Sequence, residues 1–508
     1  MSVGRCQLFF CTLMGCWLAN QQSARGENPG STLRAGVARI DITNPRTLPV
    51  RDRLFVRALV LRSGENTAVL ITVDAVAIGG IGPIGNEYLD RVRGRLGKEL
   101  GVPSTAVVVN ASHCHGIVCD DMEEKTVAAV RLAMGSLVAV KVGAGSGHED
   151  RIMENRRLRL KSGREVDVRH AYSLPPEEEV VGAGPVDPQI GLLRLDQLDG
   201  TPLAMVFNFA CHPIMGLPGG ENTADISGFA CKTIEETLGG VALFVQGCGG
   251  DINPIRYKDA SQPRDAEPLG TRLGVSAMRT LRQIGCASDA PLRIVAEKIG
   301  LPRADLTRDI ARLEAELTRL TGSLQGTTLD LKSFLAVLVR HDLSPDFPAG
   351  PSHRYLHEKK MGRDDLEQLD TGNRRDIQAY RDNIRTMEAL TRNQTNLALL
   401  RRHQKDSQAA GFRPMEVEVM GLRVGDFSLV TFPGELTAQI GLNIKAAAKR
   451  PNSFVAGYTN GYLFYLPTEA QRKNTGYAQE DCDCLVAPQW RKIFDERTDA
   501  VLTKLAAP

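Results

Sequence analysis

Three histidines in two short segments are the residues of this sequence best suited to metal chemistry. His113 and His115 stand in Asn110-Ala-Ser-His-Cys-His-Gly116, and His212 stands in Asn208-Phe-Ala-Cys-His-Pro213. Imidazole is the commonest zinc ligand, and side chains two residues apart on a strand project to the same side. The two segments therefore indicate a metal site. Hydrogen-bonded or packed histidines at the ends of strands are the alternative interpretation.

Two further segments carry groups that such a site would use. Val245-Gln-Gly-Cys-Gly-Gly-Asp-Ile-Asn-Pro254 contains glycines that let backbone amides approach a ligand closely. It lacks the Walker lysine, which argues against a nucleotide-binding loop, and an ordinary tight turn is the alternative. Phe432-Pro-Gly-Glu-Leu-Thr437 offers the carboxylate of Glu435. That carboxylate is either a functional group or a charge partner for the start of a helix.

Each of the four segments follows a predicted strand, and open α/β sheets place their sites at the ends of strands. Continuous apolar runs predict strands at 106–110, 203–209 and 241–246, and apolar spacing predicts helices at 87–100, 123–134 and 228–238. Strands and helices alternate in this way from about residue 36 to residue 300. The fold class that follows is α/β, a layered domain with a mixed β-sheet flanked by helices.

A helical insertion interrupts this pattern. Leu306, Ile310, Leu313, Leu317 and Leu320 repeat at steps of four and three residues, with charged residues between them. This spacing predicts a long amphipathic helix that forms a hairpin with a second helix at 377–403. We interpret the hairpin as a packing or dimerising insertion. Strand character resumes after Gly411, so we divide the chain as follows: signal peptide 1–26, first part of the α/β domain 30–302, helical insertion 303–411, and completing part 412–508.

The composition excludes several classes of protein. Charged residues make up 24% and hydrophobic residues 42% of the 508 residues, which is typical of a globular protein and argues against disorder or a polytopic membrane protein. The 62 basic and 60 acidic side chains nearly cancel, so we expect no nucleic-acid partner.

The first 26 residues have the pattern of a signal peptide. Arg5 precedes an apolar run from Leu8 to Ala19, and Ala24-Arg-Gly26 fits a cleavage site. We therefore expect an exported protein, whether secreted, periplasmic or in the cell envelope. Leu13-Met-Gly-Cys16 is similar to a lipoprotein box, which adds lipoprotein anchoring as an alternative. Eight cysteines remain after this leader. An even count in an exported protein permits disulfides without assigning them.

As a set, the motifs resemble the neutral/alkaline non-lysosomal ceramidase family. The resemblance covers about residues 36–302 and 411–490, in matching order and spacing, and does not cover the insertion. The matching pieces are Ser112-His-Cys-His115, Asn155-Arg156, Asn208-Phe-Ala-Cys-His-Pro213, Asp225-Ile-Ser-Gly228, Gln246-Gly-Cys-Gly-Gly-Asp-Ile-Asn-Pro254, Phe432-Pro-Gly-Glu-Leu-Thr437 and Gly457-Tyr-Thr-Asn-Gly-Tyr462.

The resemblance implies a site and a reaction. One Zn²⁺ would be held by His113, His212, Glu435 and Tyr465, with Tyr458 and Tyr462 as alternatives for the tyrosine. The implied catalytic residues are His115, Asn253 and Arg156. Zinc-activated water would hydrolyse the amide of ceramide or a related N-acyl lipid to an amine and a fatty acid. His115, the tyrosine hydroxyl or the amides of the Gly247–Gly250 loop would stabilise the oxyanion.

The sequence departs from the family pattern at three points. Asn253 stands where the family has a serine, and asparagine forms hydrogen bonds but cannot act as a nucleophile. Gly116-Ile-Val-Cys replaces the usual Ser-Gly-Pro. The chain ends soon after the tyrosine motif, so we expect no C-terminal immunoglobulin-like domain.

These departures keep two alternatives open. One is a zinc hydrolase acting on a different amide or ester, and the other is a non-catalytic envelope binding protein with a degraded site. The expected partner is a small N-acyl lipid or amide, with peripheral membrane contact. The sequence does not specify the oligomeric state.

Overall fold

The structure is a computed structural model that describes residues 32–46, 49–168, 174–216, 221–255, 257, 263–342, 352–475 and 478–507. The predicted signal peptide at 1–26, with Cys16, lies outside the described residues. Within the described part, the helices include none that is long and apolar enough to cross a membrane. The eight cysteines from Cys114 to Cys484 are all free thiols, and six of them are buried.

The centre of the protein is an eight-stranded mixed sheet with the strand order β12-β11-β10-β5-β1-β2-β3-β4. The β3–β4 and β11–β12 pairs are parallel and the other pairs are antiparallel. The strands are β1 (Arg34–Asp41), β2 (Phe55–Ser63), β3 (Asn66–Val73), β4 (Val107–Ala111), β5 (Val138–His148), β10 (Gln189–Gln197), β11 (Pro202–Phe209) and β12 (Val241–Gln246).

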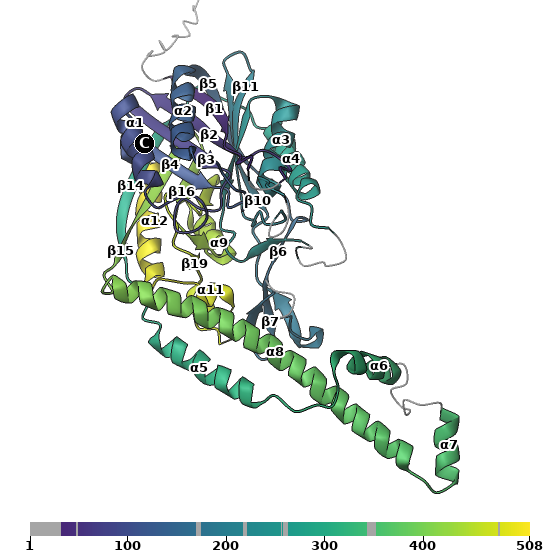
Figure 1. Ribbon diagram of the computed structural model, residues 1–508. Coiled ribbons are helices and arrows are strands. Elements are labelled where there is room, and N and C mark those ends of the chain that lie inside the picture. Colours follow the sequence, from purple (N-terminus) through teal and green to yellow (C-terminus); the bar gives the residue numbers. More distant parts are fainter. Residues whose placement is uncertain are drawn as a thin grey trace, which may run out of the picture.

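Four helices cover one face of this sheet (Figure 1). α1 (Tyr88–Leu100) and α2 (Met122–Gly135) pack on β2, β3 and β4, whereas α3 (Asp225–Leu238) and α4 (Glu267–Leu281) pack on β10, β11 and β12. The sequence directs this packing because the helices carry apolar side chains at helical spacing, such as Val92 and Leu96 of α1. β4 is buried along its whole length, which explains its continuous apolar sequence.

A second sheet stacks on the opposite face, with the strand order β14-β15-β16-β18. Its strands are β14 (Leu292–Leu301), β15 (Met415–Val424), β16 (Phe427–Thr431) and β18 (Ser453–Ala456). Leu59 and Val206 of the first sheet meet Leu422 and Leu429 of the second in a shared core. α9 (Ala438–Ala447) and α12 (Trp490–Ala506) cover the outer face. The layers are therefore helices, sheet, sheet and helices, which confirms the predicted α/β class with a mixed sheet.

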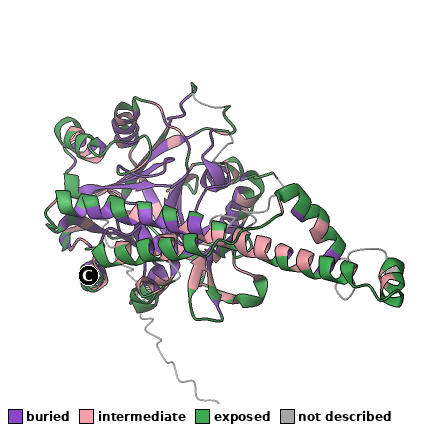
Figure 2. Ribbon diagram, turned by 60° about the horizontal axis from the view of Figure 1, so that its bottom comes forward, coloured by how far each residue is buried: buried purple, intermediate pink, exposed green. Residues whose placement is uncertain are grey.

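The helical insertion consists of α5 (Thr307–Gly322), α6 (Leu331–Asp342), α7 (Ser352–Lys360) and α8 (Asp365–Ala409). The hairpin of two long helices is present, but α8 is 45 residues long and extends well beyond the predicted 377–403. The first turns of α8 lack an apolar stripe, so the apolar spacing did not predict them. They contain no proline, so nothing ends the helix there. α5 and the last turns of α8 pack together, while the other end of α8 projects from the body with α6 and α7 (Figures 1 and 2).

The remaining elements are short. They are η1 (Ser104–Ala106), β6 (Met153–Asn155), β7 (Arg157–Leu160), β8 (Glu165–Asp167), η3 (Glu177–Glu179), β9 (Val180–Ala183), β13 (Ile252–Pro254), β17 (Glu435–Leu436), β19 (Tyr465–Leu466), α10 (Glu469–Arg472) and α11 (Gln479–Cys482).

Candidate metal centre

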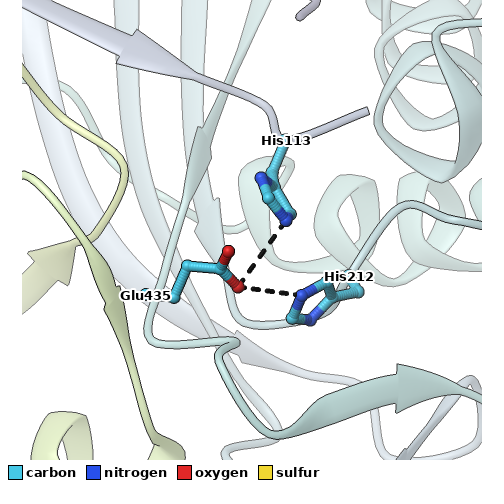
Figure 3. Close-up of side chains that lie close together, drawn as sticks. All are labelled: His113, His212 and Glu435. Carbon is cyan, nitrogen blue, oxygen red and sulfur yellow. Dashed lines mark hydrogen bonds and ion pairs between the residues drawn. The ribbon is translucent and has the colours of Figure 1, made fainter. Parts of the chain in front are cut away.

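His113, His212 and Glu435 point toward one another at the ends of three strands (Figure 3). The Nε2 atom of His212 lies 3.1 Å from Oε2 of Glu435, and Nε2 of His113 lies 3.6 Å from the same oxygen. The three groups offer ligand atoms within 4.8 Å of one another, and all three side chains are buried. This buried group is able to hold a metal ion.

The backbone after β4 places His113. The residue has a φ of 67°, a left-handed conformation that costs a non-glycine residue about 1–3 kcal/mol. The amide of His113 donates to the carbonyl of Ala75, and its Nδ1 donates to the carbonyl of Val76 at 2.6 Å. The segment that follows β3 thus fixes both the backbone and the ring of His113.

A single carbonyl fixes His212. Both the amide and the Nδ1 atom of His212 donate to the carbonyl of Ile252, each at 3.0 Å. Since a carbonyl oxygen only accepts, Nδ1 carries the proton in His212 as it does in His113. Each neutral imidazole then directs the lone pair of Nε2 toward Glu435. Such outer contacts fix the tautomer of histidines that bind metals.

The charges in the centre favour a cation there. Burial lowers the pKa of His113 to about 4 and also lowers the pKa of His212, so both rings are neutral at neutral pH. Burial raises the pKa of Glu435, but the hydroxyls of Tyr458 and Tyr462 donate hydrogen bonds that favour its ionised form. Two nitrogen lone pairs and a carboxylate therefore face one another, and this donor set fits Zn²⁺.

Three tyrosines of one segment surround the centre. The hydroxyl of Tyr458 donates to Oε2 of Glu435 at 3.2 Å, and the hydroxyl of Tyr462 donates to Oε1. Tyr465 pairs with Glu435 in the parallel β17–β19 ladder, and its ring stacks on His212 with centroids 6.5 Å apart. The assignment of Tyr465 as a metal ligand stays a prediction. The contacts of the other two hydroxyls were not predicted, because they depend on a turn in which Tyr458 has a φ of 52°.

Arg156 and Asn253 lie together beside Tyr465. The Nη1 atom of Arg156 donates to Oδ1 of Asn253 at 3.3 Å, and its guanidinium lies 5.3 Å from the centroid of the Tyr465 ring. Arg156 also forms a buried ion pair with Glu480 at 2.6 Å. Burial opposes the charge of Arg156, but Tyr465 and Glu480 raise its pKa well above the usual range, so the side chain is a permanent cation.

His115 occupies the solvent side of the centre. Its side chain is exposed, and its ring meets the edge of the His113 ring with centroids 5.4 Å apart. The structure therefore places all of the predicted site residues at or beside one centre. The buried members are His113, Arg156, His212, Asn253, Glu435 and Tyr465.

Gln246 is a positioning residue that the sequence did not single out. It ends β12, and its Nε2 donates to the carbonyls of Ser112 at 3.2 Å and Cys211 at 2.7 Å. These are the residues immediately before His113 and His212. One buried amide thus holds the two histidine segments together. Its place in the glycine-rich motif was the available signal, but a glutamine there does not reveal its partners.

Three amides of the glycine-rich loop, which were predicted as oxyanion donors, form backbone hydrogen bonds instead. The amide of Gly247 donates to Phe209, that of Gly249 to Gly247, and that of Gly250 to Leu436. These three amides are therefore committed to backbone carbonyls. A Cβ atom on Gly250 would lie 2.6 Å from the carbonyl oxygen of Glu435, so the glycine allows the loop to pack against the strand of the metal centre.

Known structures share this fold. The chain matches the crystal structure of neutral ceramidase from Pseudomonas aeruginosa with a TM-score of 0.57 and 16% identity, covering 94% of this chain and 76% of that chain. It matches a ceramidase complexed with C2 with a TM-score of 0.56 and 20% identity, over the same shares. No protein-family model and no curated protein matches the sequence. The chain therefore has the fold of neutral ceramidase.

Proposed function

We propose that this protein is a zinc-dependent hydrolase of N-acyl amide bonds that acts on ceramide or a related N-acyl lipid. The observation that carries the proposal is the convergence of two imidazole Nε2 atoms on the buried carboxylate of Glu435. The fold shared with neutral ceramidase and the motif resemblance support the choice of substrate class.

His113, His212 and Glu435 would hold the zinc ion, with Tyr465 as the proposed fourth ligand. When bound, Zn²⁺ supplies a Lewis acid for a carbonyl oxygen and lowers the pKa of a water molecule toward neutrality. Tyr458 and Tyr462 hydrogen-bond to Glu435 and so orient the carboxylate. The guanidinium of Arg156 over the Tyr465 ring favours negative charge on that phenol.

The remaining residues would handle the substrate. Because Oδ1 of Asn253 accepts from Arg156, the amide nitrogen is the end of Asn253 that donates to a bound carbonyl or hydroxyl. Arg156 is paired with Glu480 and therefore positions Asn253 and Tyr465. His115 lies at the exposed side of the centre, where it would polarise the carbonyl or carry a proton to the leaving amine. No protein nucleophile is required, which fits the asparagine at position 253.

The leader motif also supports a proposal about where the protein acts. Export through the 1–26 signal peptide, with lipoprotein anchoring at Cys16 as the alternative, would bring the enzyme to substrates outside the cytosol. N-terminal sequencing of the mature protein would test cleavage of the leader, and cell fractionation would test export of the protein.

The test is hydrolysis of a short-chain ceramide, with the matching ester as a comparison substrate. We expect the purified protein to cleave the amide, to lose this activity after chelation, and to regain it when zinc is added. His113→Ala should be inactive, whereas His148→Ala, at an exposed histidine outside the centre, should keep full activity. Full activity of His113→Ala would refute the proposal. Cleavage of the ester but not the amide would favour the alternative zinc hydrolase.

A further inference from the structure

Exposed apolar side chains gather on the part of the helical insertion that projects from the body. We call this part the arm and define it as α6, α7 and residues 361–387 (Figure 2). Of the fifteen large apolar side chains that are exposed among the described residues, eight belong to the arm. They are Leu331, Leu335, Val339, Leu356, Met361, Leu369, Ile384 and Met387. Isolated exposed leucines are ordinary, but such a concentration indicates an interaction surface.

α6 has two distinct faces. Its inner face packs on α8, where the ring of Phe334 stacks on Tyr380 with centroids 4.3 Å apart. Leu331, Leu335 and Val339 follow one another at steps of four residues and form a single stripe away from this contact. These three side chains are 60%, 50% and 58% exposed. The helix thus presents an apolar stripe to solvent that its own packing does not require.

Cationic side chains border the apolar ones. Lys332 and Arg340 flank the stripe of α6, and Arg354, Lys359 and Lys360 surround Leu356 on α7, which is 64% exposed. Among the described residues, none of these five cations has an ion-pair partner. The one acidic residue of α7, Glu358, pairs with Arg363 at 2.8 Å. The exposed surface of the two helices is therefore both apolar and positively charged.

We propose that the arm docks on the surface of an anionic phospholipid bilayer. The α6 stripe and Leu356 would enter the boundary between headgroups and acyl chains, and the five cations would contact lipid phosphates. Helices that lie in this interface combine large apolar residues with Lys and Arg in the same way. The inference rests on the arm alone, so its outcome is independent of whether the metal centre hydrolyses lipids.

The test is cosedimentation of the full-length mature protein with phosphatidylcholine vesicles that contain or lack phosphatidylglycerol. We expect binding to the anionic vesicles that weakens as salt is added. The triple variant Leu331→Ser, Leu335→Ser, Val339→Ser should lower the vesicle partition coefficient at least tenfold. Lys359→Gln with Lys360→Gln should lower it only on anionic vesicles.

A matched control comes from the body of the protein. Leu132, Val181 and Leu198 are 58%, 61% and 50% exposed, and their change to serine should leave vesicle binding unchanged. Thermal unfolding of each variant separates a docking defect from a folding defect. Equal loss in the control and arm variants, or wild-type binding by the arm variant, would overturn the proposal. So would an arm-dependent dimer in analytical ultracentrifugation without vesicle binding, because the stripe would then face a second copy.

Discussion

The imidazoles of His113 and His212 present Nε2 to Glu435 because each Nδ1 is bound to a backbone carbonyl, at Val76 and Ile252. The motif resemblance allowed these candidate ligands to be predicted, and the sequence placed each of them after a strand. It did not allow their partners to be predicted. These partners lie 37 and 40 residues away in the sequence. Every residue has a backbone carbonyl, so the residue type does not show which one accepts the hydrogen bond.

Asn253 provides a test of substrate handling at the scale of one residue. Asn253→Ala removes the proposed donor to the substrate without touching His113, His212 or Glu435. We expect kcat/KM for the amide to fall about 100-fold, as when a single donor to an oxyanion is removed, with zinc content unchanged. Steady-state kinetics and zinc analysis on the same preparation measure both quantities. Loss of zinc would instead show that Asn253 is needed to assemble the centre.

At the scale of elements, the strands and helices of the first sheet could be predicted because each has a strong local pattern. β12 lies at 241–246 as expected, and α1 begins one residue after the predicted start. The pairing of β14 with β15 was not predicted, because it joins segments separated by the whole insertion. α6 and α7 were not predicted, because the predicted hairpin contained only the two long helices.

The start of α3 provides a test of pH dependence. Asp52 accepts hydrogen bonds from the Thr223 hydroxyl and the Ala224 amide, and burial, with Asp74 and Asp225 nearby, raises its pKa to about 7. The folded state therefore holds this proton more tightly than the unfolded chain. Its ionised form costs stability that grows as pH rises from about 4 to 7.

We expect Asp52→Asn to stabilise the protein at pH 8 by about 1–2 kcal/mol and to have little effect at pH 4. The amide oxygen keeps both hydrogen bonds. Thermal unfolding at the two pH values measures the difference. Asp41→Asn is the control of opposite sign, because hydrogen bonds from Thr43 and Arg53 outweigh burial and lower the pKa of Asp41. An equal gain for Asp52→Asn at both pH values would contradict the account.

At the scale of the whole molecule, the two stacked sheets and their helices form the body, and the insertion joins it through its base. There Asn393 of α8 donates to the carbonyl of Leu313 of α5, and Arg392 donates to the carbonyl of Asp167 of the body. Gln325 and Asn383, which lies near the body end of the arm, exchange two hydrogen bonds. The arm beyond this point is therefore not needed to complete the core.

Replacement of residues 327–381 by a short Gly-Ser linker should leave the body folded. We expect the shortened protein to keep its zinc content and a cooperative unfolding transition, because the clusters that form the core lie outside the replaced segment. It should lose vesicle binding. Elemental analysis, circular dichroism and cosedimentation measure these properties. Loss of zinc or of cooperative unfolding would show that the arm supports the body.

The central claim is that His113, His212 and Glu435 hold a metal ion, and the most direct measurement is zinc per purified chain in wild type and His212→Ala. We predict about one zinc ion per chain in the wild type and in the control His148→Ala. We predict little zinc in His212→Ala, since the loss of one of three convergent ligands abolishes tight binding. No zinc in the folded wild type after zinc is supplied, or equal zinc in His212→Ala, would contradict the account.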